Sequence, residues 1–71
     1  MDSKFEIKFY SGDALLGTQT VRSDDYDRVY DIAQKQLYAP GETINFAESK
    51  KRRVMINKEK ITHIVVIDPT E

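Results

Sequence analysis

Helical periodicity is confined to one segment of the chain, and this restriction limits the fold more than any other feature. In residues 24–38 the apolar side chains recur at intervals of three and four, which is the spacing of one helix face. Residues 23–25 are all capping types, and Pro40-Gly41 follows the segment. The pattern predicts an amphipathic helix. Its buried stripe should consist of Tyr26, Val29, Tyr30, Ala33 and Leu37.

The other segments alternate apolar and polar residues with the period of two that is typical of half-buried strands. Strands are predicted over residues 4–10, 14–22, 43–47, 53–57 and 61–68. Gly17 interrupts the second strand, which indicates an edge strand with a bulge or a close approach. The order β-β-α-β-β-β predicts a small α+β domain, with one amphipathic helix packed on a mostly antiparallel, strongly bent sheet. The turn-linked last two strands resemble the closing strands of small Sm-like barrels, and this resemblance also implies a bent sheet.

The length of 71 residues limits how stable such a fold can be. No linker and no repeat divides the chain, so residues 1–71 are predicted to form a single domain. A chain of this size buries only about 60% of its unfolded surface. It contains no cysteine, which excludes disulfides, thiolate nucleophiles and zinc fingers. We therefore expect additional stability to come from a partner or from a second copy of the chain.

The last predicted strand, residues 61–68, has apolar residues on both parities. Such a strand is expected at the centre of a sheet. One helix can cover only one face of that sheet, and Tyr10, Leu16 and Met55 also fall on outward parities. The sequence therefore predicts a homodimer. Its interface should include Ile64, Val65, Val66 and Ile67.

Charge is segregated along the chain although the formal total is only −1. Residues 49–60 contain six basic residues and one acidic residue. The predicted basic patch consists of Lys50, Lys51, Arg52, Arg53, Lys58 and Lys60. Three interpretations are open. The patch is a solvated turn that discourages edge pairing, a contact to DNA or RNA phosphates, or a site for an acidic partner such as residues 24–31 of a second copy.

The sequence contains no recognisable catalytic or metal-binding motif. His63 is the single histidine, and we expect it to be a buried or half-buried packing residue, because no Ser or Cys motif supplies a nucleophile. The acidic cluster lacks the spacing of a calcium loop and is explained more simply by helix capping. That cluster consists of Asp24, Asp25, Asp27 and Asp31. We therefore predict no catalytic residue, no metal, no cofactor and no enzymatic activity.

Neither a secretory signal nor a membrane span is expected. Charged residues interrupt the N-terminal segment, and the longest apolar run is residues 64–67. The expected location is the cytoplasm. The sequence thus predicts a small non-catalytic interaction module, of unknown process, that self-associates and binds a protein partner. The alternative is a nucleic-acid-binding accessory protein that uses the basic hairpin at residues 50–53.

Overall fold

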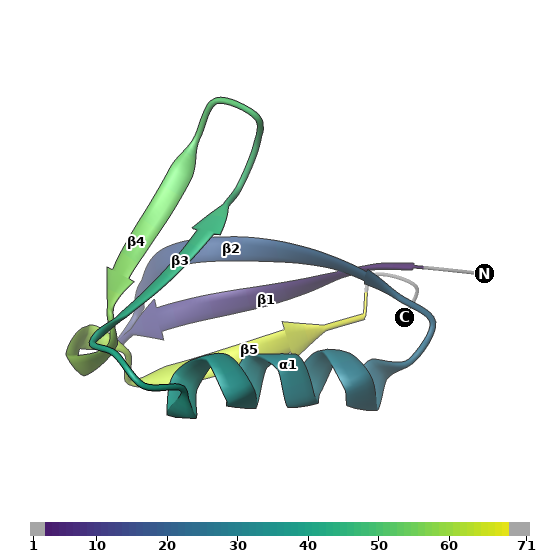
Figure 1. Ribbon diagram of the computed structural model, residues 1–71, viewed down its shortest axis with the longest axis horizontal. Coiled ribbons are helices and arrows are strands. Elements are labelled where there is room, and N and C mark those ends of the chain that lie inside the picture. The colour runs from purple at the N-terminus through teal and green to yellow at the C-terminus, as the bar shows by residue number, and fades with distance from the viewer. Residues whose placement is uncertain (1–2, 69–71) are drawn as a thin grey trace.

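The central strand of the structure is β1, which pairs on both sides with antiparallel neighbours. The computed structural model describes residues 3–68 and shows two sheets, ordered β2-β1-β5 and β3-β4, with one helix (Figure 1). The elements are β1 (Ser3–Ser11), β2 (Ala14–Ser23), α1 (Tyr26–Tyr38), β3 (Thr43–Ala47), β4 (Arg53–Asn57), the 3-10 turn η1 (Lys58–Lys60) and β5 (His63–Ile67). The predicted α+β class and the order β-β-α-β-β-β are confirmed.

The helix begins and ends where its capping residues require. Asp25 is the N-cap, and its side chain accepts a hydrogen bond of 3.0 Å from the backbone N–H of Asp27. The Ser23 hydroxyl accepts in turn from the N–H of Asp25 at 3.1 Å. Gly41, which follows the helix, has a φ of 116°, a left-handed conformation that favours glycine. At the N-terminal end, capping and the helix dipole explain Asp25 and Asp27, as the sequence predicted, whereas Asp31 pairs with Lys35 at 3.1 Å.

One face of the three-stranded sheet carries the core. Phe5 lies 6.0 Å from the ring of Tyr26 on the helix, whereas Phe9 stacks at 5.3 Å on Phe46 of β3. Phe5 and Phe9 have the same parity on β1, so α1 and the β3–β4 hairpin cover the same face of the sheet. The buried apolar residues are Phe5, Ile7, Phe9, Val29, Ala33, Ile44, Phe46 and Ile56.

Gly17 allows the hairpin to approach the sheet, as the sequence predicted. A Cβ at this position would lie 3.0 Å from the ring of Phe46 and 3.2 Å from Val54. The β1–β2 register shifts between Phe9 and Tyr10, opposite this glycine, which is a bulge. The bulge breaks strict alternation, so Leu16 packs against the core and Leu15 is exposed. The prediction that Leu16 points outward was therefore wrong.

The buried stripe of the helix is rotated from the predicted one. Val29 and Ala33 are buried as expected, but Tyr26 and Tyr30 remain 44% and 49% exposed, and the predicted burial of both was wrong. Ile32, which was not predicted, packs against the core instead. The tyrosines lie on the β5 side of the helix, beyond which the described chain has no further strand to cover them.

The prediction that the last strand is central was also wrong. β5 is an edge strand, and β1 occupies the centre because it pairs with both β2 and β5. β4 and β5 do not pair with each other, since they belong to different sheets. His63 is exposed rather than buried, because its parity places it on the outer face of the sheet. Over residues 3–68, no element packs on that outer face.

Candidate interaction surfaces

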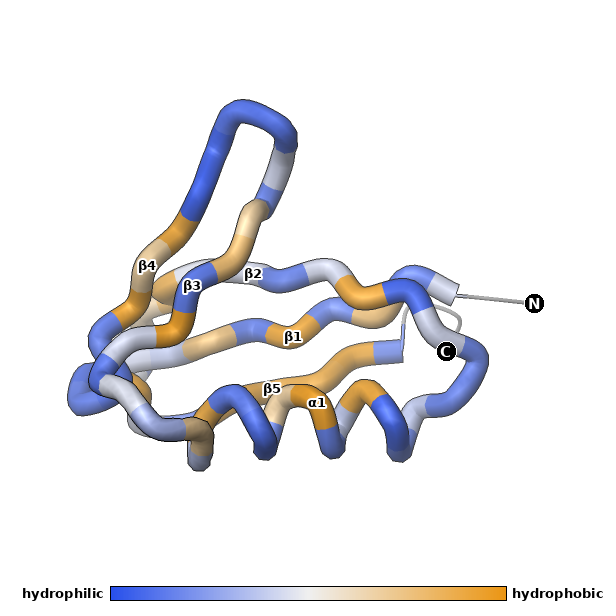
Figure 2. Tube along the Cα trace, in the orientation of Figure 1, coloured by the Kyte–Doolittle hydropathy of each residue, from blue (hydrophilic) through white to orange (hydrophobic). Residues whose placement is uncertain are grey.

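The basic hairpin tip, residues 48–53, projects from the body of the protein. Figure 1 shows the tip standing clear of the sheet, and Figure 2 shows it as mostly hydrophilic, with one pale stretch. Backbone hydrogen bonds close the turn, with the N–H of Glu48 donating to the carbonyl of Arg52 at 2.9 Å. All four predicted basic residues of the tip are exposed. They are Lys50, Lys51, Arg52 and Arg53.

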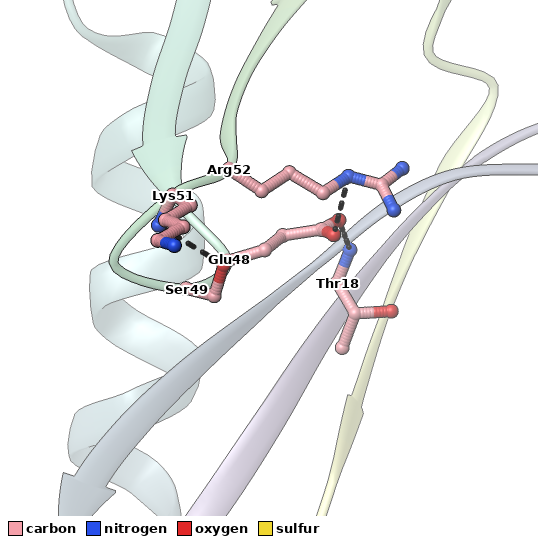
Figure 3. A network of polar contacts seen from close by, with 5 residues as sticks. All are labelled: Thr18, Glu48, Ser49, Lys51 and Arg52. Carbon is pink, nitrogen blue, oxygen red and sulfur yellow. Dashed lines mark hydrogen bonds and ion pairs between the residues drawn. The ribbon is translucent and has the colours of Figure 1, made fainter.

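Glu48 connects this tip to the edge of β2 (Figure 3). One carboxylate oxygen, Oε1, accepts from the backbone N–H of Thr18 at 3.1 Å, and Oε2 lies 3.2 Å from Nε of Arg52. The charge of Arg52 is therefore opposed by a carboxylate, and that carboxylate also satisfies a backbone donor of the edge strand. Over the described part of the chain, no ion pair engages Lys50, Lys51 or Arg53, so these three carry the net charge of the tip.

Lys58 and Lys60 do not extend this patch. They lie on η1, at the other end of β4, which at about 3.3 Å per residue separates them from the tip by roughly 15 Å. The Nζ of Lys58 donates a hydrogen bond to the carbonyl of Ala39, just after the end of α1. A cation is favourable there, because the helix dipole is negative at its C-terminal end. The six predicted basic residues thus form two separate groups.

The second surface is the β5–α1 groove, which runs between the helix and the edge strand. It has a volume of about 220 Å³, smaller than the roughly 300–1,000 Å³ typical of small-molecule sites. The lining is mostly apolar and aromatic, and consists of Tyr30, Ala33, Gln34, Leu37, Tyr38, Ile61, Thr62, His63, Ile64 and Val66. Tyr26 continues the same flank toward Val66 and Ile67. The groove therefore suits a row of side chains better than a whole small molecule.

The backbone of β5 faces this groove at alternate residues. The Tyr26 hydroxyl donates to the carbonyl of Val66 at 3.2 Å, so this carbonyl points away from β1. Backbone groups alternate in direction along a strand, so those of Ile64 point the same way. The residues predicted for self-association are placed here: Ile64 and Val66 on the core face, Val65 and Ile67 on the outer face. Val65 is 37% exposed.

An aromatic pair stands at the start of β5. The rings of Tyr10 and His63 stack with centroids 4.8 Å apart and an angle of only 5° between their planes. The Thr62 hydroxyl lies 3.0 Å from Nδ1 of His63, and it accepts at 2.8 Å from the N–H of Gly12. These contacts join the β1–β2 turn to the beginning of β5. In residues 3–68, no three His, Asp or Glu side chains are grouped closely enough to hold a metal ion.

Sequence reasoning missed two residues that define these surfaces. Glu48 lies between two predicted strands, and nothing in the sequence indicates that its carboxylate reaches a distant strand. Tyr38 was not assigned to any surface, although it follows Tyr30 by eight residues and so continues one flank of the helix. The spacing of Tyr26, Tyr30 and Tyr38 was the available signal, because tyrosine is favoured where a surface is partly apolar and partly wet.

Comparison with known proteins does not assign either surface. No protein-family model matches the chain, and no characterised protein or solved structure resembles it closely enough to count as a match. Within the described residues, no helix is long and apolar enough to cross a membrane. The function of the chain must therefore be inferred from its own geometry.

Proposed function

We propose that the chain is a small non-catalytic interaction module that self-associates and binds protein through the β5 edge and the adjoining flank of α1. The observation that carries this proposal is a strand edge with which no strand of residues 3–68 pairs, next to a groove lined by apolar and aromatic side chains. Three tyrosines on the helix are 44% or more exposed beside that groove: Tyr26, Tyr30 and Tyr38.

Two properties of this surface support protein binding. An unpaired edge can accept an added strand, whose main-chain hydrogen bonds provide affinity while pockets for alternate side chains provide specificity. Tyrosine is enriched in interface centres, because it buries a large apolar area and still offers a hydroxyl. The β5–α1 groove offers both, with Ile64 and Val66 as the backbone positions and Tyr30 as an aromatic wall.

The test is site-specific photocrosslinking in cells. A photoreactive amino acid at Val65 reports on the β5 edge, and the same amino acid at Thr20 reports on the outer face of β2, where Thr20 is also exposed. We expect protein adducts from position 65 and few from position 20. Absence of adducts at 65, or equal adducts at both positions, would contradict the proposal.

Nucleic-acid binding by the hairpin tip is the second candidate. It is favoured by the projection of the tip together with three basic side chains that no carboxylate opposes in the described chain: Lys50, Lys51 and Arg53. Phosphate contacts by such side chains release counterions and make binding strongly dependent on salt. A titration of labelled DNA and RNA at low and physiological salt tests it, and absence of binding at low salt would exclude it.

A further inference from the structure

Several features of the β5 edge indicate which polypeptide pairs with it. We infer that the occupant is a second copy of this chain, whose β5 pairs antiparallel with the first around a twofold axis at Val65. This inference rests on the proposed interaction function of the same surface. Three strands from each copy would then form one continuous six-stranded sheet. Four features of the described residues support this arrangement.

The first feature is the direction of the backbone groups. Ile64 and Val66 both present their N–H and C=O to the open edge. With Val65 opposite Val65, Ile64 of one copy faces Val66 of the other, and each such pair exchanges both backbone hydrogen bonds. This register pairs every residue of β5, whereas a shift by two residues leaves part of the strand unpaired. The carbonyl of Val66 can keep its bond to Tyr26, since a carbonyl oxygen has two lone pairs.

The second feature is the side chain at the axis. Val65 occupies a non-hydrogen-bonded pair in this register, where opposing side chains lie closest. A valine facing its own copy is a β-branched pair, which stabilises antiparallel sheets. Pairing at the axis would bury part of Val65 on the outer face, where this residue is 37% exposed in the described part of one chain. Apolar residues on both parities of β5 thus have a use in an edge strand.

The third feature is the distance between the two helices. α1 contacts all three strands and so lies over the middle of the sheet, near β1. With strands about 4.8 Å apart, the axis lies about 7 Å from β1, and the two helices lie about 14 Å apart. Helices in direct contact are only about 8–10 Å apart, so large side chains must fill the space. The helix flank that faces the axis carries three such side chains, Tyr26, Tyr30 and Tyr38.

The fourth feature is charge. The start of β5 follows η1, where two lysines and Glu59 leave a net charge of +1, whereas its end lies beside the N-terminus of α1, which carries the acidic cap. Antiparallel pairing places the basic end of one copy next to the acidic end of the other, twice by symmetry. A parallel arrangement would bring like charges together. An extended peptide lacks this reciprocal match, so the charge distribution favours a second copy.

The absence of cysteine allows a direct test by disulfide trapping. In a non-hydrogen-bonded antiparallel pair the Cα atoms lie about 4.5 Å apart, within the range of about 4.4–6.8 Å that a disulfide spans. Val65→Cys should therefore oxidise to a covalent dimer. Thr20→Cys, which is exposed on the opposite edge strand, is the matched control. We expect the Val65→Cys dimer to form roughly tenfold faster or more, because paired thiols have an effective concentration in the millimolar range.

Mixed samples test the register. His63→Cys and Ile67→Cys should cross-link to each other when mixed, and neither should cross-link efficiently to itself. Equal rates for Val65→Cys and Thr20→Cys, or self-linkage of His63→Cys, would overturn the inference. If the Val65 photocrosslinker captures another protein while Val65→Cys stays monomeric, protein binding at the β5 edge stands, whereas self-association through that edge is excluded. If both experiments are negative, the proposed function fails as well.

Discussion

The two edges of the three-stranded sheet differ in how the fold protects them. Next to β2, the β3–β4 hairpin packs on Gly17, and the carboxylate of Glu48 accepts the backbone N–H of Thr18. Next to β5, the Tyr26 hydroxyl bonds to the carbonyl of Val66, and a groove lies between this strand and α1. An unprotected edge strand is a template for pairing with another chain. Within residues 3–68, the β3–β4 hairpin thus protects the β2 edge, and no strand pairs with the open edge of β5.

The stability of the hairpin packing next to β2 should depend most strongly on Phe46. Phe46→Ala removes the ring that stacks on Phe9 and contacts Gly17, so we expect the free energy of unfolding to fall by about 3–5 kcal/mol. Tyr30→Ala, on the open side, removes a half-exposed ring and should cost about 1 kcal/mol or less. Urea denaturation of both variants measures the difference. Equal losses would show that the groove flank is as structural as the hairpin.

A larger side chain at Gly17 should disturb the same packing, because it adds volume where Phe46→Ala removes it. Gly17→Val places a Cβ 3.0 Å from the ring of Phe46 and adds two methyl groups, so the neighbouring side chains must shift, at an expected cost of about 1–3 kcal/mol. Thr20→Val, an exposed position on the same strand, serves as the control and should change stability by less than about 0.5 kcal/mol. If both valines are tolerated alike in thermal denaturation, the close approach of the hairpin is not required.

Local patterns predicted the elements of this fold well, and they failed where distant segments meet. The helix, its N-terminal cap and the buried face of β1 follow from residue spacing alone. The order of strands in the sheet does not follow from spacing, because it depends on which pair of strands gives the most stable contact. β5 reads as a central strand since both parities are apolar, yet β1 takes the centre.

The candidate surfaces show the same limit. The basic run at residues 50–53 was visible in the sequence as a hairpin tip. The ion pair between Glu48 and Arg52 joins residues four positions apart in one turn. The hydrogen bond from Thr18 to Glu48 spans thirty positions, and no local pattern indicates it. The burial of Tyr26 and Tyr30 was predicted from helical spacing, which fixes a stripe only to within about one residue. Its rotation toward Ile32 depends on where the sheet ends.

Glu48 allows the role of edge protection to be measured separately. Glu48→Ala removes the acceptor for the Thr18 N–H, which is half-buried, so we expect a loss of about 1 kcal/mol. Glu48→Gln keeps an acceptor oxygen and removes only an ion pair to the mostly exposed Arg52, which should cost about 0.5 kcal/mol or less. Hydrogen exchange at Thr18 should accelerate in the alanine variant and much less in the glutamine variant. Identical exchange in the two would assign the effect to charge rather than to the backbone hydrogen bond.

The smallest effect on stability is expected at the exposed cations of the tip. Replacing Lys50, Lys51 and Arg53 together with alanine should change the free energy of unfolding by about 0.5 kcal/mol or less, because none has an ion pair in the described chain. If the tip only protects β2, this triple variant should behave like the original protein in every binding assay. If the tip also contacts phosphates, three contacts predict a log–log salt slope of about −2.7 for duplex DNA, and the triple variant should lose it. Arg52→Ala is the matched control, because its charge is already opposed by Glu48 and its removal should leave most of that slope in place. A flat salt dependence in the original protein would confine the hairpin to its structural role at the β2 edge.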